Sequence, residues 1–283
     1  QNVESEDGNN VYLTIDETIQ SICEKYMQKG VEDNNVLNKG VCIAMDVNTG
    51  AILAMVTTDG YDLNNPYELS AKDKKKIKST PKKKQAEAES AALSNMWRNK
   101  AVADTYMPGS VFKMCVASAA LEENLVNEKT SFTCTGSISV EGETIHCSNI
   151  SGHGTQNFVE VISNSCNPAF IQIGQMLGAG KFRQYYQGFG FSDKTGIDLP
   201  GEAEDSFWKE GKMGGVDLAV ASFGQNFTIT PIQMITACAA VSNGGYVVQP
   251  HVVSKITDSK GNVIKSVDKK VKRQVISDDT SKK

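Results

Sequence analysis

A serine and a lysine three residues apart are the first candidates for chemistry in this chain. Ser110 follows a Pro108-Gly109 corner, and Lys113 lies in a segment that the sequence predicts as the first turn of a helix. Residues three apart share one helix face, so the amine can lie beside the hydroxyl. A serine becomes an effective nucleophile when a neighbouring base takes its proton, and a desolvated lysine can be that base. The spacing therefore predicts a nucleophilic serine with Lys113 as its general base.

The alternative interpretation of this pair is a helix-capping serine followed by a solvated lysine. The residues that follow argue against it, because they are almost continuously apolar: Val111, Phe112, Met114, Cys115, Val116, Ala117, Ala119, Ala120 and Leu121. A helix of this composition is buried on most sides, and a lysine is rarely buried without a specific role.

A second polar pair lies downstream, where Ser165 and Asn167 are two residues apart with Cys166 between them. On a loop or a strained turn, the hydroxyl and the amide can face one cleft. The hydroxyl can then relay a proton, and the amide can hold a substrate carbonyl or amide group. The alternative is an Asn167-Pro168 turn with polar capping residues.

The chain has 7 cysteines, an odd number, so they cannot all pair with one another. Four lie in apolar segments and are predicted to be small buried side chains: Cys23, Cys42, Cys115 and Cys238. The other three lie in polar or loop contexts, near His146 and His153. Three interpretations of this group stay open: a structural zinc site formed by Cys134, Cys147, His153 and Cys166, a Cys147–Cys166 disulfide with redox control of the loop, or free thiols.

Composition places the chain among ordinary globular proteins. It has 283 residues, 40% hydrophobic and 22% charged, and its net charge of -4 gives nucleic-acid binding no support. No apolar run approaches the ~18–20 residues of a membrane span, and no signal peptide is recognised. The lysine-rich residues 72–84 predict a solvated helix face or loop, with a role at an anionic surface as the alternative.

Local patterns predict several elements. They are a helix at 17–27, a hairpin of strands 41–47 and 51–57 around the turn at 48–50, helices within 218–221 and 231–241, and strands at 246–253 and 263–267 around the turn at 259–262.

Taken in order, these motifs make the chain resemble a known family, the class B penicillin-binding proteins, in their transpeptidase domain. Besides Ser110-x-x-Lys113 and Ser165-x-Asn167, the resemblance rests on residues 11–16 with Gln20, 44–55, 61–66, 97–99, 152–155, 195–202, 224–225 and 230–233. It runs from about Val11 to the C-terminus, and the order and spacing of the segments make it specific.

The resemblance implies an α/β (α+β) fold of the penicillin-binding transpeptidase and serine β-lactamase type. In this fold an antiparallel sheet is flanked by helices, with a mostly helical subdomain beside it. It implies a serine acyltransferase that cross-links peptidoglycan stem peptides in division or sporulation and is acylated by β-lactams. Ser110 would be the nucleophile, Lys113 the base, Ser165 the proton shuttle and Asn167 the substrate-orienting group. Structural zinc is not needed for this chemistry.

The family's partners and location follow from the same resemblance. They are a membrane glycosyltransferase, a membrane anchor in the full-length protein, and the extracytoplasmic face of the bacterial membrane, with no nucleic acid. The alternatives are a D,D-carboxypeptidase or β-lactamase, in which water deacylates the serine, and a catalytically silent scaffold or β-lactam-sensing domain.

Two departures from the family pattern stand out. Met107 lies where the family usually has an acidic residue before Pro-Gly-Ser. Lys194-Thr195-Gly196 lies between turn-forming residues, so we do not assign it as the family's third motif, Lys-Thr-Gly on a strand. The resemblance places that motif beyond Lys283. We therefore expect residues 1–283 to be a transpeptidase domain that is incomplete at its C-terminus and lacks the anchor and pedestal domain.

Overall fold

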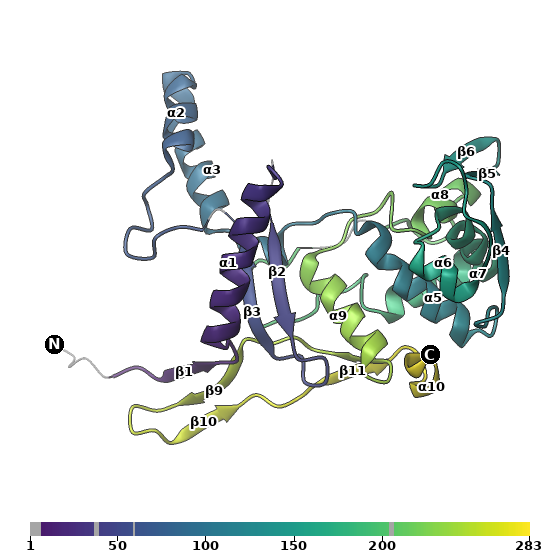
Figure 1. Ribbon diagram of the computed structural model, residues 1–283. Coiled ribbons are helices and arrows are strands. Elements are labelled where there is room, and N and C mark those ends of the chain that lie inside the picture. Colours follow the sequence, from purple (N-terminus) through teal and green to yellow (C-terminus); the bar gives the residue numbers. More distant parts are fainter. Residues whose placement is uncertain (1–6, 37–39, 59, 204–206) are drawn as a thin grey trace.

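The computed structural model describes residues 7–36, 40–58, 60–203 and 207–283. Figure 1 shows two lobes, one in which helices pack on strands and one that is mostly helical, with a helical arm projecting from the first. The predicted mixed α/β class is confirmed. The strands are antiparallel as predicted, and the described ones form one three-stranded and four two-stranded sheets.

The first lobe contains the first and the last of the described strands, β1 and β11. Its strands pair in the orders β1-β9-β10, β2-β3 and β8-β11. Its elements are β1 (Asn10–Leu13), α1 (Glu17–Asp33), β2 (Val41–Met45), β3 (Ile52–Thr57), α4 (Lys100–Ala103), α9 (Pro231–Ser242), β8 (Tyr246–Val248), β9 (Val253–Thr257), β10 (Val263–Ser266) and β11 (Val271–Gln274).

The second lobe holds the candidate catalytic residues. Its short strands pair as β4-β7 and β5-β6. Its elements are η2 (Gly109–Phe112), α5 (Lys113–Glu122), β4 (Ser131–Cys134), β5 (Ser137–Val140), β6 (Glu143–His146), β7 (Gly154–Asn157), α6 (Phe158–Ser163), α7 (Asn167–Gly188, kinked at Gly178), α8 (Gly215–Ala221) and α10 (Asp278–Lys282).

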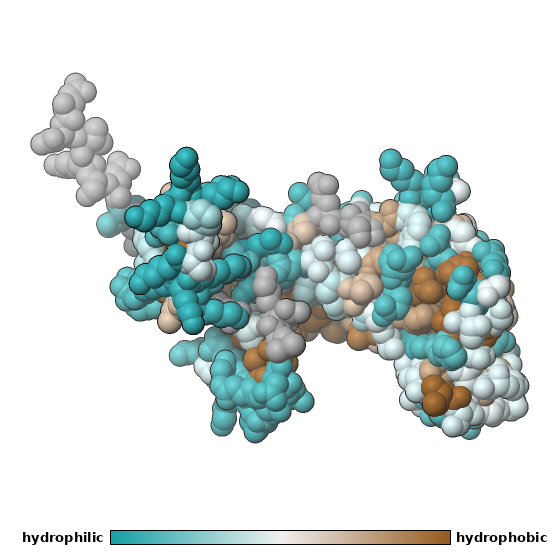
Figure 2. Space-filling model, turned by 90° about the horizontal axis from the view of Figure 1, so that it is seen from above, coloured by the Kyte–Doolittle hydropathy of each residue, from teal (hydrophilic) through white to brown (hydrophobic). Residues whose placement is uncertain are grey.

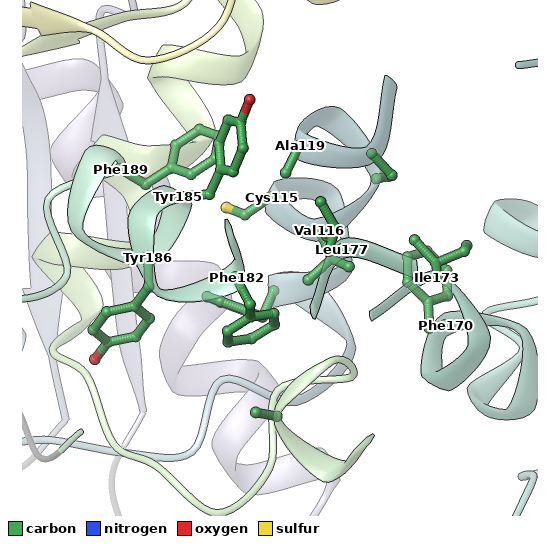
Figure 3. Packing of buried hydrophobic residues seen from close by; sticks show 14 of the residues in the cluster. Cys115, Val116, Ala119, Phe170, Ile173, Leu177, Phe182, Tyr185, Tyr186 and Phe189 are labelled. Atoms are coloured by element: carbon green, nitrogen blue, oxygen red, sulfur yellow. The ribbon is translucent and has the colours of Figure 1, made fainter. Parts of the chain in front are cut away.

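The core of the helical lobe is the contact between α5 and α7. Figure 3 shows Cys115, Val116 and Ala119 of α5 facing apolar and aromatic side chains of α7. Beneath the start of α5, the Phe112 ring lies 4.9 to 6.3 Å, between centroids, from the rings of Phe182, Tyr186, Phe191 and Phe227. Burying such a ring contributes several kcal/mol relative to a truncated side chain, on the order of 3–5. This packing fixes where α5 begins.

The arm is a helical hairpin of α2 (Ala71–Ser79), η1 (Lys82–Lys84) and α3 (Gln85–Trp97). It projects away from the body in Figure 1, and its hydrophilic surface gathers at one end of the molecule in Figure 2. At its base the Trp97 ring packs edge-on against Tyr67, and its indole N–H donates to the carbonyl of Pro66 at 2.6 Å. The prediction of a solvated helix for the lysine-rich segment is confirmed.

Most other predicted elements are confirmed with shifted ends. The first helix continues to Asp33 and the hairpin pairs as β2-β3, but the strand predicted at 246–253 is wrong, because β8 ends at Val248 and β9 starts at Val253. Pro250 lacks the N–H that a continuous ladder needs. Within the described part of the chain, no helix combines the length and apolar character required to cross a membrane.

Candidate active site and neighbouring thiol cluster

The predicted nucleophile and base lie at the junction between η2 and α5. Ser110 lies in the 3-10 turn rather than in the α-helix, and Lys113 is the first residue of α5, so the predicted helical turn is corrected to a tighter one. Ser110 is exposed, whereas Lys113 is only 4% exposed. The turn therefore presents the hydroxyl to solvent and buries the amine beside it.

A segment far along the sequence clamps this turn. The Gly109 N–H donates to the Gly224 carbonyl at 2.9 Å, and Tyr106 and Ile229 exchange two backbone hydrogen bonds at 2.9 and 3.0 Å. Gly224 has φ +83°, and a Cβ there would lie 2.0 Å from the Gly109 carbonyl oxygen. The close approach therefore requires glycine. Sequence reasoning used Gly224 only as part of the family pattern and missed this contact.

The Lys113 amine lies among four oxygen atoms. Its Nζ is 3.3 Å from Ser110 Oγ, 3.0 Å from Ser165 Oγ, 2.8 Å from the Ser165 carbonyl and 2.7 Å from Asn167 Oδ1. Carbonyl oxygens only accept hydrogen bonds, so a neutral amine can donate its two N–H groups to Ser165 O and Asn167 Oδ1. Its lone pair is then left to accept a proton from a hydroxyl. The structure thus brings together all four residues that the two motifs predicted.

Ser165 and Asn167 are held by an unusual local backbone. Ser165 has φ +49°, the left-handed region that non-glycine residues avoid, and Asn167 begins α7. A non-glycine residue in this region costs on the order of 1–3 kcal/mol and persists only where its surroundings enforce it. Cys166 between them is fully buried, and the Asn167 amide donates to the His146 carbonyl at 3.4 Å. The turn therefore points both polar side chains at Lys113.

Burial shifts the Lys113 amine toward its neutral form. Burial lowers the pKa of Lys113 to about 8, and nearby thiol groups of Cys147 and Cys166 oppose that shift. The Nζ also lies 5.3 Å from the centroid of the buried Phe170 ring, which helps to exclude water. A base whose pKa is near the working pH is well matched to proton transfer.

A cavity of about 350 Å³ opens beside these groups, lined by Ser110, Lys113, Ser165 and Phe170 together with Met114, Ala117, Ser118, Leu121, Ile162, Val241, Thr280, Ser281 and Lys283. A larger hollow, of about 460 Å³, is lined by Arg183, Phe207 and Trp208 among others, and no nucleophile–base pair lines it. We therefore place the chemistry in the smaller cavity.

Lys194-Thr195-Gly196 takes no part in this cavity. It lies in a loop, where the Glu202 carboxylate accepts from the Thr195 N–H and hydroxyl and from the Gly196 N–H. The prediction that this tripeptide is not the family's strand motif is confirmed.

The four predicted metal ligands form one cluster behind the Ser165 turn. Cys134 ends β4, Cys147 follows β6, His153 precedes β7, and Cys166 lies just before α7. One ligand atom from each lies within 4.8 Å of all the others, and Cys147 Sγ is 3.6 Å from His153 Nδ1. His146 is exposed and is not part of the cluster. Three sulfurs and one imidazole nitrogen are a donor set that suits tetrahedral zinc.

The thiols differ in their local environment. Burial alone would raise the pKa of Cys147, but hydrogen bonds from the backbone of Asn149 and Asn167 lower it below its ordinary value. Burial raises the pKa of Cys166 to about 11. All seven cysteines are described and all are free thiols, so the Cys147–Cys166 disulfide is not formed in this structure.

Comparison with known proteins gives the class to which this fold and site belong. Residues 40–283 match the family described as "Penicillin binding protein transpeptidase domain". The chain is therefore a member of the penicillin-binding protein transpeptidase family, as its motifs predicted.

Among its relatives, Stage V sporulation protein D of Bacillus subtilis is 34% identical over 98% of this chain and 40% of the relative. The D,D-transpeptidase MrdA of Acinetobacter baumannii is 29% identical over 87% of this chain and 35% of its own length. The chain thus spans between 35% and 40% of the length of these relatives.

Solved structures agree on the fold. Penicillin-binding protein 3 of Mycobacterium tuberculosis, complexed with ampicillin, superposes with a TM-score of 0.81 at 24% identity, over 99% of this chain and 57% of that one. The D,D-transpeptidase domain of a peptidoglycan glycosyltransferase from Eggerthella lenta gives 0.80 at 24% identity, over 97% of this chain and 64% of that one.

Proposed function

We propose that this chain forms the acyl-transferring part of a peptidoglycan D,D-transpeptidase, with stem peptides that end in D-Ala-D-Ala as its substrate and β-lactams as its inhibitors. One observation carries the proposal: the buried amine of Lys113 lies 3.3 Å from the exposed Ser110 hydroxyl and is oriented by two carbonyl oxygens. The family membership and the names of the relatives support the same activity.

Each side chain has a role in the proposed reaction. Ser110 Oγ attacks the carbonyl of the penultimate D-alanine while the Lys113 amine takes its proton. The peptide C–N bond then breaks, and the Ser165 hydroxyl passes the proton to the leaving D-alanine. Asn167 orients the substrate, and the Ser110 N–H supplies part of the oxyanion hole. The amine of a second stem peptide finally replaces the serine oxygen and completes the cross-link.

Intact-protein mass spectrometry before and after incubation with ampicillin tests this assignment, on this chain and on the native gene product. We expect one covalent adduct, with the mass of the intact drug, on Ser110, and none on the Ser110→Ala variant. Full labelling of Ser110→Ala would disprove the nucleophile.

The adduct's lifetime and a model-peptide assay separate the alternative functions. Rapid loss of the adduct in water would favour a β-lactamase. Release of D-alanine from a model peptide without transfer to an added D-amino acid would favour a D,D-carboxypeptidase. Absence of labelling on the folded native gene product would favour the silent scaffold.

We place the native protein on the extracytoplasmic side of a bacterial membrane, anchored there and working beside a membrane glycosyltransferase. The similarity to Stage V sporulation protein D favours sporulation over division as its setting. Deletion of the gene should then block spore formation while vegetative division continues; a division defect would contradict this choice.

We also propose that Cys134, Cys147, His153 and Cys166 bind one structural zinc ion. Three thiolates this close would repel one another, and a divalent cation removes that repulsion. Zinc–sulfur bonds of about 2.3 Å place tetrahedral sulfurs roughly 3.8 Å apart, and the four ligand atoms here lie within 4.8 Å of one another. Through Cys166, the ion would hold the turn between Ser165 and Asn167. It supplies no step of the reaction.

Metal analysis of the purified protein tests the zinc proposal. We expect about one zinc per chain, lost in Cys134→Ala and kept in Cys115→Ala, which removes a buried thiol outside the cluster. A mass two protons below the expected value, without zinc, would indicate the disulfide instead. Absence of both zinc and that mass deficit would indicate free thiols.

A further inference from the structure

The α2–α3 arm concentrates positive charge in an otherwise acidic chain. Residues 72–84 contain eight lysines and one aspartate and carry +7, although the whole chain carries -4, so all other residues together carry -11. The eight lysines are Lys72, Lys74, Lys75, Lys76, Lys78, Lys82, Lys83 and Lys84. Nothing in the proposed catalytic mechanism uses this charge.

The arm's lysines are available to a partner. All eight are exposed, and α2 contains no buried residue. In the described ranges of the chain, Lys74 is the one of the eight that forms an ion pair, with Glu68 at 3.1 Å. The remaining lysines form no ion pair with an acidic side chain of the described residues, and Asp73 and Glu87 are the nearest acidic residues in the sequence.

The arrangement also weakens the helix that carries it. Lys72 and Lys76 are four residues apart on α2, as are Lys74 and Lys78, and like charges at this spacing destabilise a helix. The Ser70 side chain caps α2 by accepting from the Asp73 N–H at 3.1 Å, and the last-turn lysines suit the helix dipole. Anionic groups of a bound partner would offset the repulsion among these lysines.

The distribution of the lysines indicates the shape of that partner. At 3.6 residues per turn, Lys72, Lys74, Lys75, Lys76 and Lys78 form one continuous face that covers about 200° of the circumference of α2. The half-buried Ile77 lies on the opposite face, and the lysines of η1 form the tip. A flat surface can contact only part of a face this wide, whereas a chain-like polyanion can follow it around the helix and past the tip.

The arm has no means of entering a lipid bilayer. Residues 71–96, all of them described, expose no large hydrophobic side chain, and the nearest such residues are Tyr67 and Trp97 at the base. Membrane-surface helices combine basic residues with an exposed apolar face, which this arm lacks.

We propose that the α2–α3 arm is a second binding site for the wall polymer itself, through the free carboxylates of peptidoglycan stem peptides. The polymer's identity rests on the proposed function. The arm and the start of α5 lie well apart in Figure 1, so the arm adds avidity for a long, multiply charged substrate and takes no part in acylation. Each lysine–carboxylate contact is weak and screened by salt, and many together retain a polymer.

Cosedimentation with purified peptidoglycan sacculi, stripped of phosphodiester wall polymers, tests this site. We expect the variant with Lys75, Lys76, Lys82 and Lys83 changed to Glu to bind at least ~10-fold more weakly than the unmodified protein at low salt. The matched control changes four exposed lysines elsewhere, Lys129, Lys212, Lys260 and Lys265, to Glu and alters net charge equally. It should bind like the unmodified protein.

Two further measurements separate this proposal from folding and from catalysis. The four arm lysines changed to Gln keep good helix formers in place, and this variant should also lose binding. Ampicillin acylation of Ser110 should be unchanged in every variant. Absence of acylation in all variants and in the unmodified protein would disprove the proposed function, while binding of the arm to the polymer could still be measured.

Several outcomes would overturn the arm proposal. Equal weakening in the control variant would mean that net charge alone governs binding. Binding that disappears when phosphodiester polymers are stripped would assign the arm to phosphate. Binding to phosphatidylglycerol vesicles in preference to stripped sacculi would assign it to lipid, and unchanged binding by the Gln variant would remove the arm altogether.

Discussion

Lysine serves opposite purposes in the helical lobe and in the projecting arm. Lys113 is 4% exposed, and burial lowers its pKa to about 8, whereas the eight lysines of residues 72–84 are all exposed. Desolvation disfavours the charged amine, so the buried lysine becomes a base while solvated ones remain fixed charges. The comparison teaches that environment, more than residue type, decides what a lysine does in this protein.

Removing the buried amine gives the largest expected effect. Lys113→Gln should slow acylation of Ser110 by ampicillin about 10²–10⁴-fold, because general-base catalysis contributes roughly that much. Time-resolved intact-mass measurements give the rate. The matched control is Lys100→Gln: Lys100 is also buried, at 2% exposed, but its amine donates to the Thr58 carbonyl in the other lobe. It should lower stability and spare the acylation rate, and equal slowing in both variants would break the comparison.

Buried side chains beneath the turn that carries Ser110 should contribute more to stability than the exposed side chains of the same turn. Phe112→Ala should lower the free energy of unfolding by about 3–5 kcal/mol, because it empties the centre of the aromatic cluster. Urea denaturation measures the loss. Its neighbour Val111 is 49% exposed, and Val111→Ala should change stability by less than about 0.5 kcal/mol. Similar losses of unfolding free energy in the two variants would show that the packing of Phe112 does not hold the turn in place.

Crowding at the clamp can be separated from backbone strain. Gly224→Ala should cost about 1–3 kcal/mol and also slow acylation, because its Cβ would collide with the Gly109 carbonyl. Gly142 has φ +91° with nothing within 4 Å of an added Cβ, so Gly142→Ala tests strain alone. It should cost about 1–2 kcal/mol and leave acylation unchanged. Slower acylation in both would mean that the clamp does not act locally.

The pH dependence tests the state of the buried amine directly. Acylation should rise about tenfold per pH unit below pH 8 and level off above it, since only the neutral amine accepts the proton. Folding lowers this pKa from 10.5 to about 8, so the unfolded chain binds the proton more tightly. The contribution of Lys113 to stability should therefore rise as pH increases from about 8 to 10.5. A rate independent of pH between 6 and 9 would contradict the assignment.

Sequence patterns predicted the fold class and brought the site residues together correctly. Ser110, Lys113, Ser165 and Asn167 meet as their motifs suggested, and the four zinc-site candidates cluster. The order in which the strands pair was not predicted, because pairing depends on distant partners that local alternation does not reveal. The strand predicted through Pro250 also failed, although a missing N–H at proline was a signal available in the sequence.

The sequence by itself determined the types and local spacing of the reactive groups, the hairpin around 48–50 and the charge on residues 72–84. These depend on neighbours within a few residues, which share a helix face or a turn. Tertiary structure alone decided which glycine clamps the nucleophile, how far burial lowers the pKa of Lys113, and how closely the four candidate zinc ligands approach one another. Burial and contacts between segments that are distant in sequence set those properties, and local pattern carries no record of their magnitude.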